Sequence, residues 1–335
     1  MNNQAMMKFV AIAGISSIAI VSQASRPAAP VTKAMAGASA RPNPIANTEL
    51  YVDPNSNAWK TAHEWRKSRP DAAAALERIA RQPRASWINE WAGDPRRAVD
   101  RIADRITGAG ALPVFVAYNI PNRDCGSYSA GGSADASKYR KWISGFAAGL
   151  AGRKSIVILE PDALAGMSCL PERAQQERMG LIRDAVKTLK SAGAAVYIDA
   201  GHPRWQSAST MAARLNRSGI DAADGFALNV SNFQTTSANV AYGKQISRAV
   251  GGKHFVIDTS RNGAGSNGEW CNPRGRALGE NPTVHTGDGS VDAFLWVKVP
   301  GESDGSCAGA PAAGKWWPEY AVGLAERQST RLAGL

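Results

Sequence analysis

Carboxylates follow short apolar segments at five places along this chain. The segments and their acids are 114–118 with Asp124, 156–159 with Glu160 and Asp162, 195–198 with Asp199, 255–257 with Asp258, and 294–299 with Glu302 and Asp304. If the segments are parallel strands, their carboxyl ends meet on one face, so the acids should converge on one cleft. Carboxylates without a metal or phosphate motif indicate acid–base chemistry on a neutral, polyhydroxylated substrate.

Asp162 is the best candidate for an acid that keeps its proton. It follows an entirely apolar segment and stands beside Pro161 and Leu164, so burial and nearby carboxylates would both raise its pKa. The alternative is that Asp162 only caps a following helix. A second carboxyl group would activate water, and inversion at a sugar carbon places the two groups ~6.5–9.5 Å apart.

Asp124 and Asp199 are further candidates, each with a plainer alternative. Asp124 precedes Cys125, which could hold it in place, but an exposed Arg123–Asp124 pair explains the same residues. The glycine- and serine-rich residues 126–132 predict a mobile loop that could close over a ligand. Asp199 and His202 could be read as a metal pair, but hydrogen bonds to sugar hydroxyls are favoured.

The last apolar segment leads into Lys298, Glu302 and Asp304. A lysine between carboxylates keeps them ionised, which suits a base or a charge network. The chain contains no GxSxG, HExxH or Walker sequence, and its four cysteines are too widely spaced for a zinc site. We therefore expect neither a metal nor a cofactor.

Ten tryptophans are many for 335 residues. Trp87, Trp205 and Trp270 fall at or near the expected loops, where aromatic faces could stack on sugar rings. Packing in the core is the alternative for these three residues, and it is the expectation for Trp142.

The elements that must position these residues alternate between strands and helices. Strands are expected at 86–89, 114–119, 156–160, 195–199, 225–230, 255–258 and 294–298. Apolar residues at helical spacing predict helices over 139–150 and 179–189, and a further helix should follow Ser237, whose hydroxyl can cap it. Acids at five or more strand ends favour a barrel over an open sheet, in which a site gathers at one switch point.

Composition describes one folded domain with a basic exterior. Hydrophobic residues make up 44% of the chain and charged residues 20%, as in soluble globular proteins. Arginine supplies most of the net charge of +11, but it is scattered, so we expect a solvated surface and no nucleic-acid partner.

The N-terminus resembles an export signal. Lys8 precedes the apolar residues 9–21, a run too short for a comfortable membrane span. We expect an export and processing region at 1–36, a Pro-, Ala- and Ser-rich linker at 37–47, and a single domain at 48–335. The product would be a secreted monomer without stable membrane association, or an envelope-associated protein if the apolar segment is retained. Four cysteines in an exported chain predict disulfides, and three pairings are possible; pairing of sequence neighbours would tie adjacent loops on the active face.

Seven sequence blocks together resemble the family 6 glycoside hydrolases, the inverting cellulases. The resemblance covers roughly residue 50 to the C-terminus, and its blocks are YNIPNRDCGSYSAGG, ILEPDALAGM, YIDAGHPRW, ALNVSNF, VIDTSRNG, EWCNPRGRALG and FLWVKVPGESDGSC. The resemblance implies a distorted seven-stranded parallel α/β barrel. It also implies the disulfides Cys125–Cys169 and Cys271–Cys307.

The resemblance also implies roles for single residues. Asp162 corresponds to the general acid, Asp124 to its supporting carboxylate, and Asp304 to the proposed base. Asp199 matches an acid lining the site, and Tyr118 matches the tyrosine beneath the distorted sugar. Sugar-contacting positions match His202, Trp205, Asn229, Trp270, Lys298 and Glu302, and Trp87 resembles a stacking tryptophan.

Two departures from the family pattern affect the site. Two residues, Gly305 and Ser306, separate Asp304 from Cys307 where one glycine is expected, and Ala130 stands where a serine is common. The loops that would roof a tunnel look short. The resemblance therefore favours an endo-β-1,4-glucanase acting on β-1,4-glucan or cello-oligosaccharides. The alternatives are an exo-acting cellobiohydrolase, a non-catalytic glycan-binding protein and a metal-dependent hydrolase.

Overall fold

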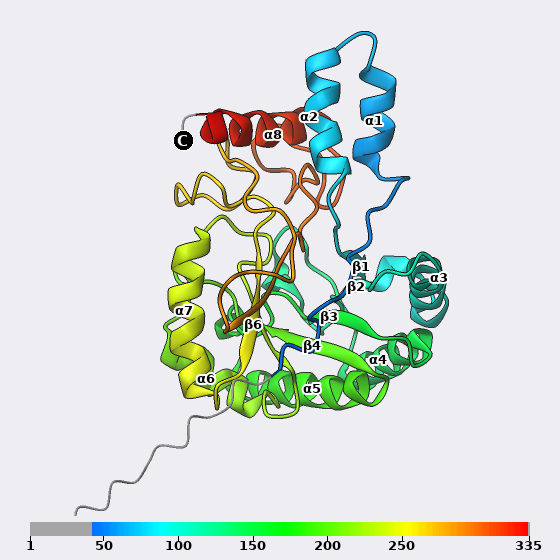
Figure 1. Ribbon diagram of the computed structural model, residues 1–335. Coiled ribbons are helices and arrows are strands. Elements are labelled where there is room, and N and C mark those ends of the chain that lie inside the picture. Colours follow the sequence, from blue (N-terminus) through cyan, green and yellow to red (C-terminus); the bar gives the residue numbers. More distant parts are fainter. Residues whose placement is uncertain (1–41, 334–335) are drawn as a thin grey trace, which may run out of the picture. The chain divides into compact units, whose positions relative to one another are not determined.

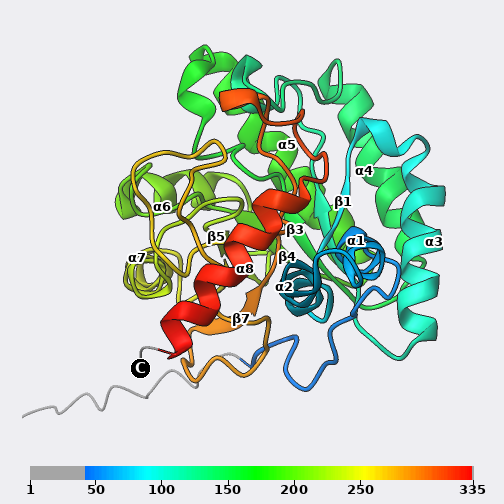
Figure 2. The same cartoon turned by 90° about the horizontal axis from the view of Figure 1, so that it is seen from above.

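The computed structural model describes residues 42–333. They form one parallel sheet of seven strands, whose neighbours follow the order of the chain, and helices around it. The strands are β1 (Ser86–Ile88), β2 (Val114–Ala117), β3 (Ser155–Leu159), β4 (Ala194–Asp199), β5 (Gly225–Leu228), β6 (His254–Asp258) and β7 (Val291–Leu295). Between β7 and β1 the Ala85 amide donates to the Trp296 carbonyl at 3.0 Å, and the Trp87 indole donates to the Val297 carbonyl at 2.8 Å. The expected distorted seven-stranded α/β barrel is confirmed as a curled, incompletely closed sheet (Figure 2).

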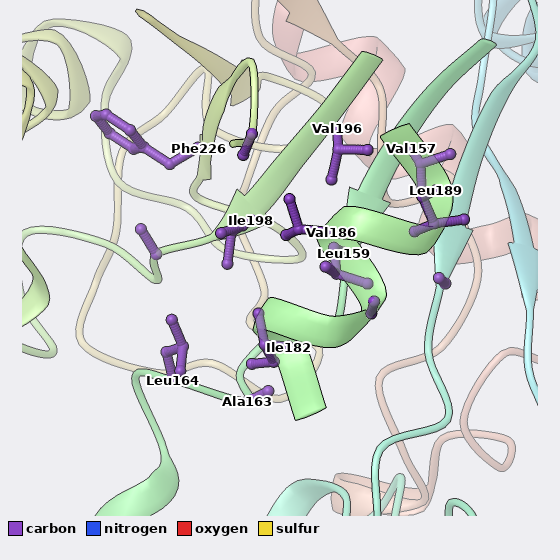
Figure 3. Close-up of a cluster of buried hydrophobic side chains, with 14 of the residues drawn as sticks. Val157, Leu159, Ala163, Leu164, Ile182, Val186, Leu189, Val196, Ile198 and Phe226 are labelled. Carbon is purple, nitrogen blue, oxygen red and sulfur yellow. The ribbon is translucent and has the colours of Figure 1, made fainter. Parts of the chain in front are cut away.

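Both faces of the sheet are buried, which explains why its strands read as nearly continuous apolar runs. Val116, Ile158 and Val256 belong to the cluster that fills the inside of the curl. The alternate residues Val157, Leu159, Val196 and Ile198 point the other way, and α5 covers them with Ile182, Val186 and Leu189 (Figure 3). This packing fixes where each strand ends and therefore where the following loops start.

Helices form the outer layer. They are α1 (Asn57–Trp65), α2 (Pro70–Ala80), α3 (Pro95–Gly108), α4 (Ala136–Leu150), α5 (Glu172–Ser191), α6 (Ala208–Arg217), α7 (Thr236–Ala249) and α8 (Pro318–Ala333). The helices α3 to α7 alternate with the strands along the chain and lie outside the sheet (Figures 1 and 2). Trp142 of α4 is buried, as expected. The remaining helices α1, α2 and α8 pack together around Trp296, next to the gap between β7 and β1.

Several boundaries differ from those expected from the sequence, and two of the differences have a clear physical reason. Helix α7 begins at Thr236 because the Thr235 hydroxyl, not that of Ser237, accepts the capping hydrogen bond from the Ala238 amide. Strand β7 begins at Val291, three residues before the expected start at 294. Its second residue, Asp292, made the segment look polar, yet this acid is buried. Its Oδ2 accepts a hydrogen bond from the Tyr197 hydroxyl at 2.7 Å, and its Oδ1 is hydrogen-bonded to His254 Nδ1 at 2.8 Å.

The folded region also begins before the expected domain start at residue 48. Ile45 is buried in the cluster inside the sheet, and the Asn43 side chain donates to the Asp292 carbonyl at 2.9 Å. Residues 43–47 therefore pack on the sheet instead of forming the last part of a linker. The expected export signal at 1–36 lies outside the described residues. Within residues 42–333, no helix is long and apolar enough to cross a membrane.

Candidate active site

A cleft of about 1350 Å³ lies at the carboxyl ends of the strands. The candidate residues that line it are Trp87, Tyr118, Asp124, Asp162, His202, Trp205, Trp270, Lys298, Glu302 and Asp304. Trp87 lies in β1 and the others follow five further strands, so the sheet brings together side chains spread over more than two hundred residues of sequence. Asp199 and Asn229 do not line the cleft, and neither do Glu160 and Asp258, two of the acids expected to converge there, which are both 1% exposed.

Asp162 follows β3 by three residues and reaches the cleft from a left-handed backbone with φ of 68°. The helix-capping alternative is wrong, because a turn and a short 3₁₀ segment, Met167–Cys169, separate Asp162 from α5. Burial raises the pKa of Asp162 well above its ordinary value, and the charges of Asp199, Asp124 and Asp304 raise it further. These surroundings favour the protonated form of the Asp162 carboxyl group.

Asp199, expected to line the site, lies beneath it and is 1% exposed. Its Oδ1 accepts hydrogen bonds from the backbone amides of Asp162 at 3.0 Å and Gly201 at 3.1 Å. Burial raises the pKa of Asp199 to about 7. The position corrects the expectation of hydrogen bonds to sugar hydroxyls, because this carboxyl group fixes the backbone under the acid instead.

Asn229, expected to contact sugar, is fully buried behind the cleft wall. Its amide donates to the Asp258 carbonyl at 2.9 Å and accepts from the Gln234 amide at 3.1 Å. The side chain is therefore committed to the loop after β5, where φ of 67° at Asn229 makes a sharp turn.

Asp124 lines the cleft and accepts one hydrogen bond, from the Ser129 amide at 2.8 Å. Burial raises its pKa, although that hydrogen bond and Arg123 oppose the shift. The expected alternative of an exposed Arg123–Asp124 pair is wrong. Arg123 is 1% exposed and binds Glu90, with its Nη1 and Nη2 at 2.5 and 2.9 Å from the two carboxylate oxygens.

Arg123 and Glu90 also hold the loop that the sequence predicted to be mobile. Arg123 Nε donates to the Ser129 carbonyl at 2.8 Å, and the Gly132 amide donates to Glu90 at 3.2 Å. At the tip of this loop, Tyr128 packs against Gly305, where a Cβ atom would lie 2.5 Å from the tyrosine ring. The loops after β2 and β7 therefore meet at one point beside the cleft, and only a glycine leaves room for that contact.

Asp304 has the opposite electrostatic environment from Asp162. Its Oδ2 accepts from Arg261 Nη1 at 2.8 Å and from the Asn272 amide at 3.0 Å, and its Oδ1 lies 3.5 Å from Lys298 Nζ. Burial would raise the pKa of Asp304, but Arg261 and Lys298 outweigh burial and hold it below its ordinary value. Asp304 therefore stays ionised, and Oδ1 remains the oxygen with capacity for water.

Asn272 fixes the Asp304 loop despite its extra residue. Its side-chain oxygen accepts from the Asp304 amide at 2.8 Å, and its side-chain nitrogen donates to the Gly305 carbonyl at 2.8 Å. In the same loop, burial raises the pKa of Glu302 and lowers that of Lys298. The two implied disulfides, Cys125–Cys169 and Cys271–Cys307, are both present in the structure.

Aromatic side chains occupy the cleft wall. Trp87 packs edge-on against Tyr118 with ring centroids 5.2 Å apart, while Trp205 and Trp270 are 40% and 49% exposed. His202 lies against Trp205, and burial lowers its pKa to about 4, so the imidazole is neutral. Such faces can stack on the apolar sides of sugar rings.

Sequence reasoning missed three residues at or near the site. Trp91 lines the cleft and is 69% exposed; its position four residues after Trp87 was the signal that could have identified it. Arg261 lies in the block VIDTSRNG, but nothing in that block shows which carboxylate it meets. Arg178 lies in the middle of α5 and gives no local signal.

The arrangement provides one carboxyl group whose surroundings favour its protonated form, one whose surroundings favour its ionised form, and aromatic side chains along the cleft wall. Within residues 42–333, no group of three or more His, Cys, Asp or Glu is placed to hold a metal ion. Residues 45–328 match the family model described as glycosyl hydrolases family 6.

The chain belongs to glycosyl hydrolases family 6.

Similar proteins agree with this membership. The chain is 50% identical to endoglucanase A of Cellulomonas fimi over 285 residues, which cover 84% of this chain and 62% of that protein. It is 44% identical to endoglucanase 1 of Streptomyces halstedii, with 81% and 87% covered. The structure of the Mycobacterium tuberculosis endoglucanase Cel6 with a methyl-cellobiosyl-thio-cellobioside matches with a TM-score of 0.82 and 47% identity, covering 86% of this chain and all of that one. The resemblance inferred from the sequence blocks is confirmed.

Proposed function

We propose that this protein is a secreted endo-β-1,4-glucanase that hydrolyses internal bonds of cellulose with inversion at the anomeric carbon. The observation that carries the proposal is the opposite surroundings of two carboxyl groups in one cleft: burial and neighbouring carboxylates raise the pKa of Asp162, and Arg261 and Lys298 hold the pKa of Asp304 low against burial. Inverting hydrolysis needs this combination, because one group must give a proton while the other accepts one. The names of the similar family members support the substrate class.

In this mechanism, the Asp162 carboxyl group protonates the glycosidic oxygen as the bond to the anomeric carbon breaks. Asp304 Oδ1 takes a proton from a water molecule, whose oxygen attacks that carbon from the other face. The charge of Asp124 raises the pKa of Asp162 and so favours the protonated form that can donate. Trp87 and Tyr118 support the sugar ring, and Lys298 and Glu302 contribute contacts and charge near Asp304.

The endo mode is supported by the short loops around the cleft. Tyr128 packs against Gly305 and lies with its ring centroid 5.8 Å from that of Trp270, so the contacts found between the loop after β2 and the loops after β6 and β7 are made by one side chain at the edge of the cleft. An exo-acting cellobiohydrolase of the same fold is the alternative, and it would need these loops to enclose the chain end. We further propose that residues 1–36 direct export, that the enzyme works as a monomer, and that it requires no metal.

Two assays on one preparation test the proposal. On carboxymethylcellulose, viscosity should fall early, well ahead of the release of reducing ends, and added chelator should change neither rate. Proton NMR of cellotetraose should show the α-anomer first. Cellobiose as the main early product with little loss of viscosity would favour the exo alternative, and a β-anomer would contradict inversion.

A further inference from the structure

Arg178 of α5 is a buried cation, only 3% exposed, whose side chain donates to backbone carbonyls. Its Nη1 donates to the Ala163 carbonyl at 3.2 Å, and its Nη2 donates to the carbonyls of Pro121 and Asn122 at 2.7 and 2.9 Å. The planar guanidinium offers several donors in a fixed fork, so one side chain can bind carbonyls of two chain segments together.

These carbonyls belong to the two loops that carry Asp124 and Asp162. Pro121 and Asn122 lie just before Asp124 in the loop after β2, and Ala163 directly follows Asp162 in the loop after β3. Behind the cleft, Arg178 therefore joins the backbone just before Asp124 to the backbone just after Asp162.

Glu160 binds the β2 loop from the same side. This carboxylate, two residues before Asp162, is 1% exposed and accepts hydrogen bonds at 3.0 Å from the amides of Asn119 and Ile120. Glu160 in its ionised form attracts Arg178 across the interior, although burial raises the pKa of Glu160 to about 7. The β2 loop is thus bound at its amides by Glu160 and at its carbonyls by Arg178.

The backbone of both loops needs such support. Left-handed φ values occur at Asn122 (54°), Asp124 (56°), Glu160 (51°) and Asp162 (68°), none of which is glycine. Such conformations are unfavourable for residues with a Cβ atom and persist only where the surroundings impose them. The disulfide Cys125–Cys169 joins the same two loops, but Cys125 is exposed and Arg178 is buried, so the two links act at different depths.

We propose that Arg178, together with Glu160, is a positioning residue that sets the separation and orientation of Asp124 and Asp162. The inference rests on the proposed function, in which Asp162 is the general acid. Groups that face Asp162 are Asp124 and Tyr118 from the β2 side, Asp199 from β4 and Asp304 from the β7 side. Because Arg178 holds the carbonyls of Pro121 and Asn122 before Asp124 and of Ala163 after Asp162, loosening the bridge should change the separation of Asp124 and Asp162 first.

The test compares Arg178→Met and Arg178→Lys with Arg173→Gln, an exposed arginine on the same helix. Arg178→Met should lower kcat on cellotetraose by about 10²-fold with little change in KM, since misplacement by about 1 Å costs that much. The loss should be smaller on an aryl cellobioside with an acidic leaving group. Weaker repulsion from Asp124 should also move the alkaline limb of the pH–rate profile to lower pH. Arg178→Lys should recover part of kcat, and Arg173→Gln should match the parent protein.

Hydrogen exchange of residues 119–126 provides a readout that does not depend on activity. Exchange there should rise in both Arg178 variants and stay unchanged in Arg173→Gln; if Arg178→Met does not fold, Arg178→Lys decides. Unchanged loop exchange, or unchanged kcat and alkaline limb in a folded variant, would overturn the positioning role. If the parent protein does not cleave cellotetraose, or if Asp162→Asn remains fully active, the proposed function fails while the exchange result still decides whether Arg178 holds the loop.

Discussion

The two sides of the cleft place an aspartate in opposite electrostatic environments. On the side of β2 and β3, Asp162 faces other carboxylates, and the nearby cation Arg123 is bound to Glu90 instead. On the side of β6 and β7, Asp304 accepts directly from Arg261 and lies close to Lys298. Each side has a disulfide next to its acid, so the difference lies in charge and not in covalent restraint.

This comparison shows that the pKa of a cleft carboxyl group depends on which group a nearby arginine binds, and not only on whether an arginine is nearby. Both Arg123 and Arg261 are fully buried beside a catalytic candidate, but only Arg261 donates to a cleft carboxylate. Arg123 holds a loop, which leaves Asp124 and Asp162 without a direct counter-charge. Burial without a partner favours the protonated carboxyl group, and burial with a cation favours the carboxylate.

Removal of the proton donor should have the largest effect. Asp162→Asn should reduce the rate on cellulose by ~10²–10⁴-fold, the usual contribution of general acid catalysis. Substrates with a very acidic leaving group should lose far less, because their departure needs no proton. Initial rates on cellotetraose and on a dinitrophenyl cellobioside measure the difference, and equal losses on both would remove Asp162 from this role.

Removal of the cation on the other side should affect stability and pH dependence together. Arg261→Met leaves Asp304 buried with only Lys298 nearby, and loss of one partner of a buried pair costs about 3–5 kcal/mol of folding free energy. The pKa of Asp304, now held low, should rise, so the acidic limb of the pH–rate profile should move to higher pH. Urea unfolding and kcat/KM against pH measure the two effects.

Arg274→Met is the matched control, because this arginine is exposed in the neighbouring loop. It should leave both the unfolding midpoint and the acidic limb unchanged. An Arg261→Met protein with the parent acidic limb would mean that Arg261 does not control the ionisation of the active-site carboxylate.

Trp91 allows a smaller test of the cleft wall beyond the two acids. The guanidinium carbon of Arg123 lies 5.5 Å from the Trp91 ring centroid, and the ring remains 69% exposed. If it stacks on a sugar, Trp91→Ala should raise KM for cellohexaose about 2- to 10-fold, as expected for loss of one aromatic contact of about 0.5–1.5 kcal/mol. Cellotriose hydrolysis should change little. Equal changes for short and long substrates would place Trp91 outside the binding path.

Much of the fold could be predicted because strand and helix patterns are local. Short apolar runs, five of them followed by acids, indicated the seven strands, and the position of Asp162 after β3 already indicated a raised pKa. The direction in which a side chain points after the end of a strand does not follow from such a local pattern. Asp199 and Asn229 point into the protein, where each has one hydrogen-bond partner in its own loop and another from a different part of the chain.

Long-range partners explain what the sequence could not reveal. Arg178 contacts residues more than fifty positions away, and Arg261 meets Asp304 across 43 positions. Neither spacing repeats a helical or strand period, so no pattern within one segment predicts either contact. The polar start of β7 was misleading for the same reason, since the partners of Asp292 are Tyr197 and His254 on other strands.

The division of charge across the cleft can be measured directly by titrating carboxyl carbons in protein labelled with ¹³C at the aspartate side chain. Signals absent from Asp162→Asn and from Asp304→Asn identify the two groups. We predict that the Asp162 signal titrates above the ordinary aspartate range and that the Asp304 signal titrates below it, so that at intermediate pH one is protonated and the other ionised. Titration of both groups together in the ordinary range, or in the reverse order, would contradict the account.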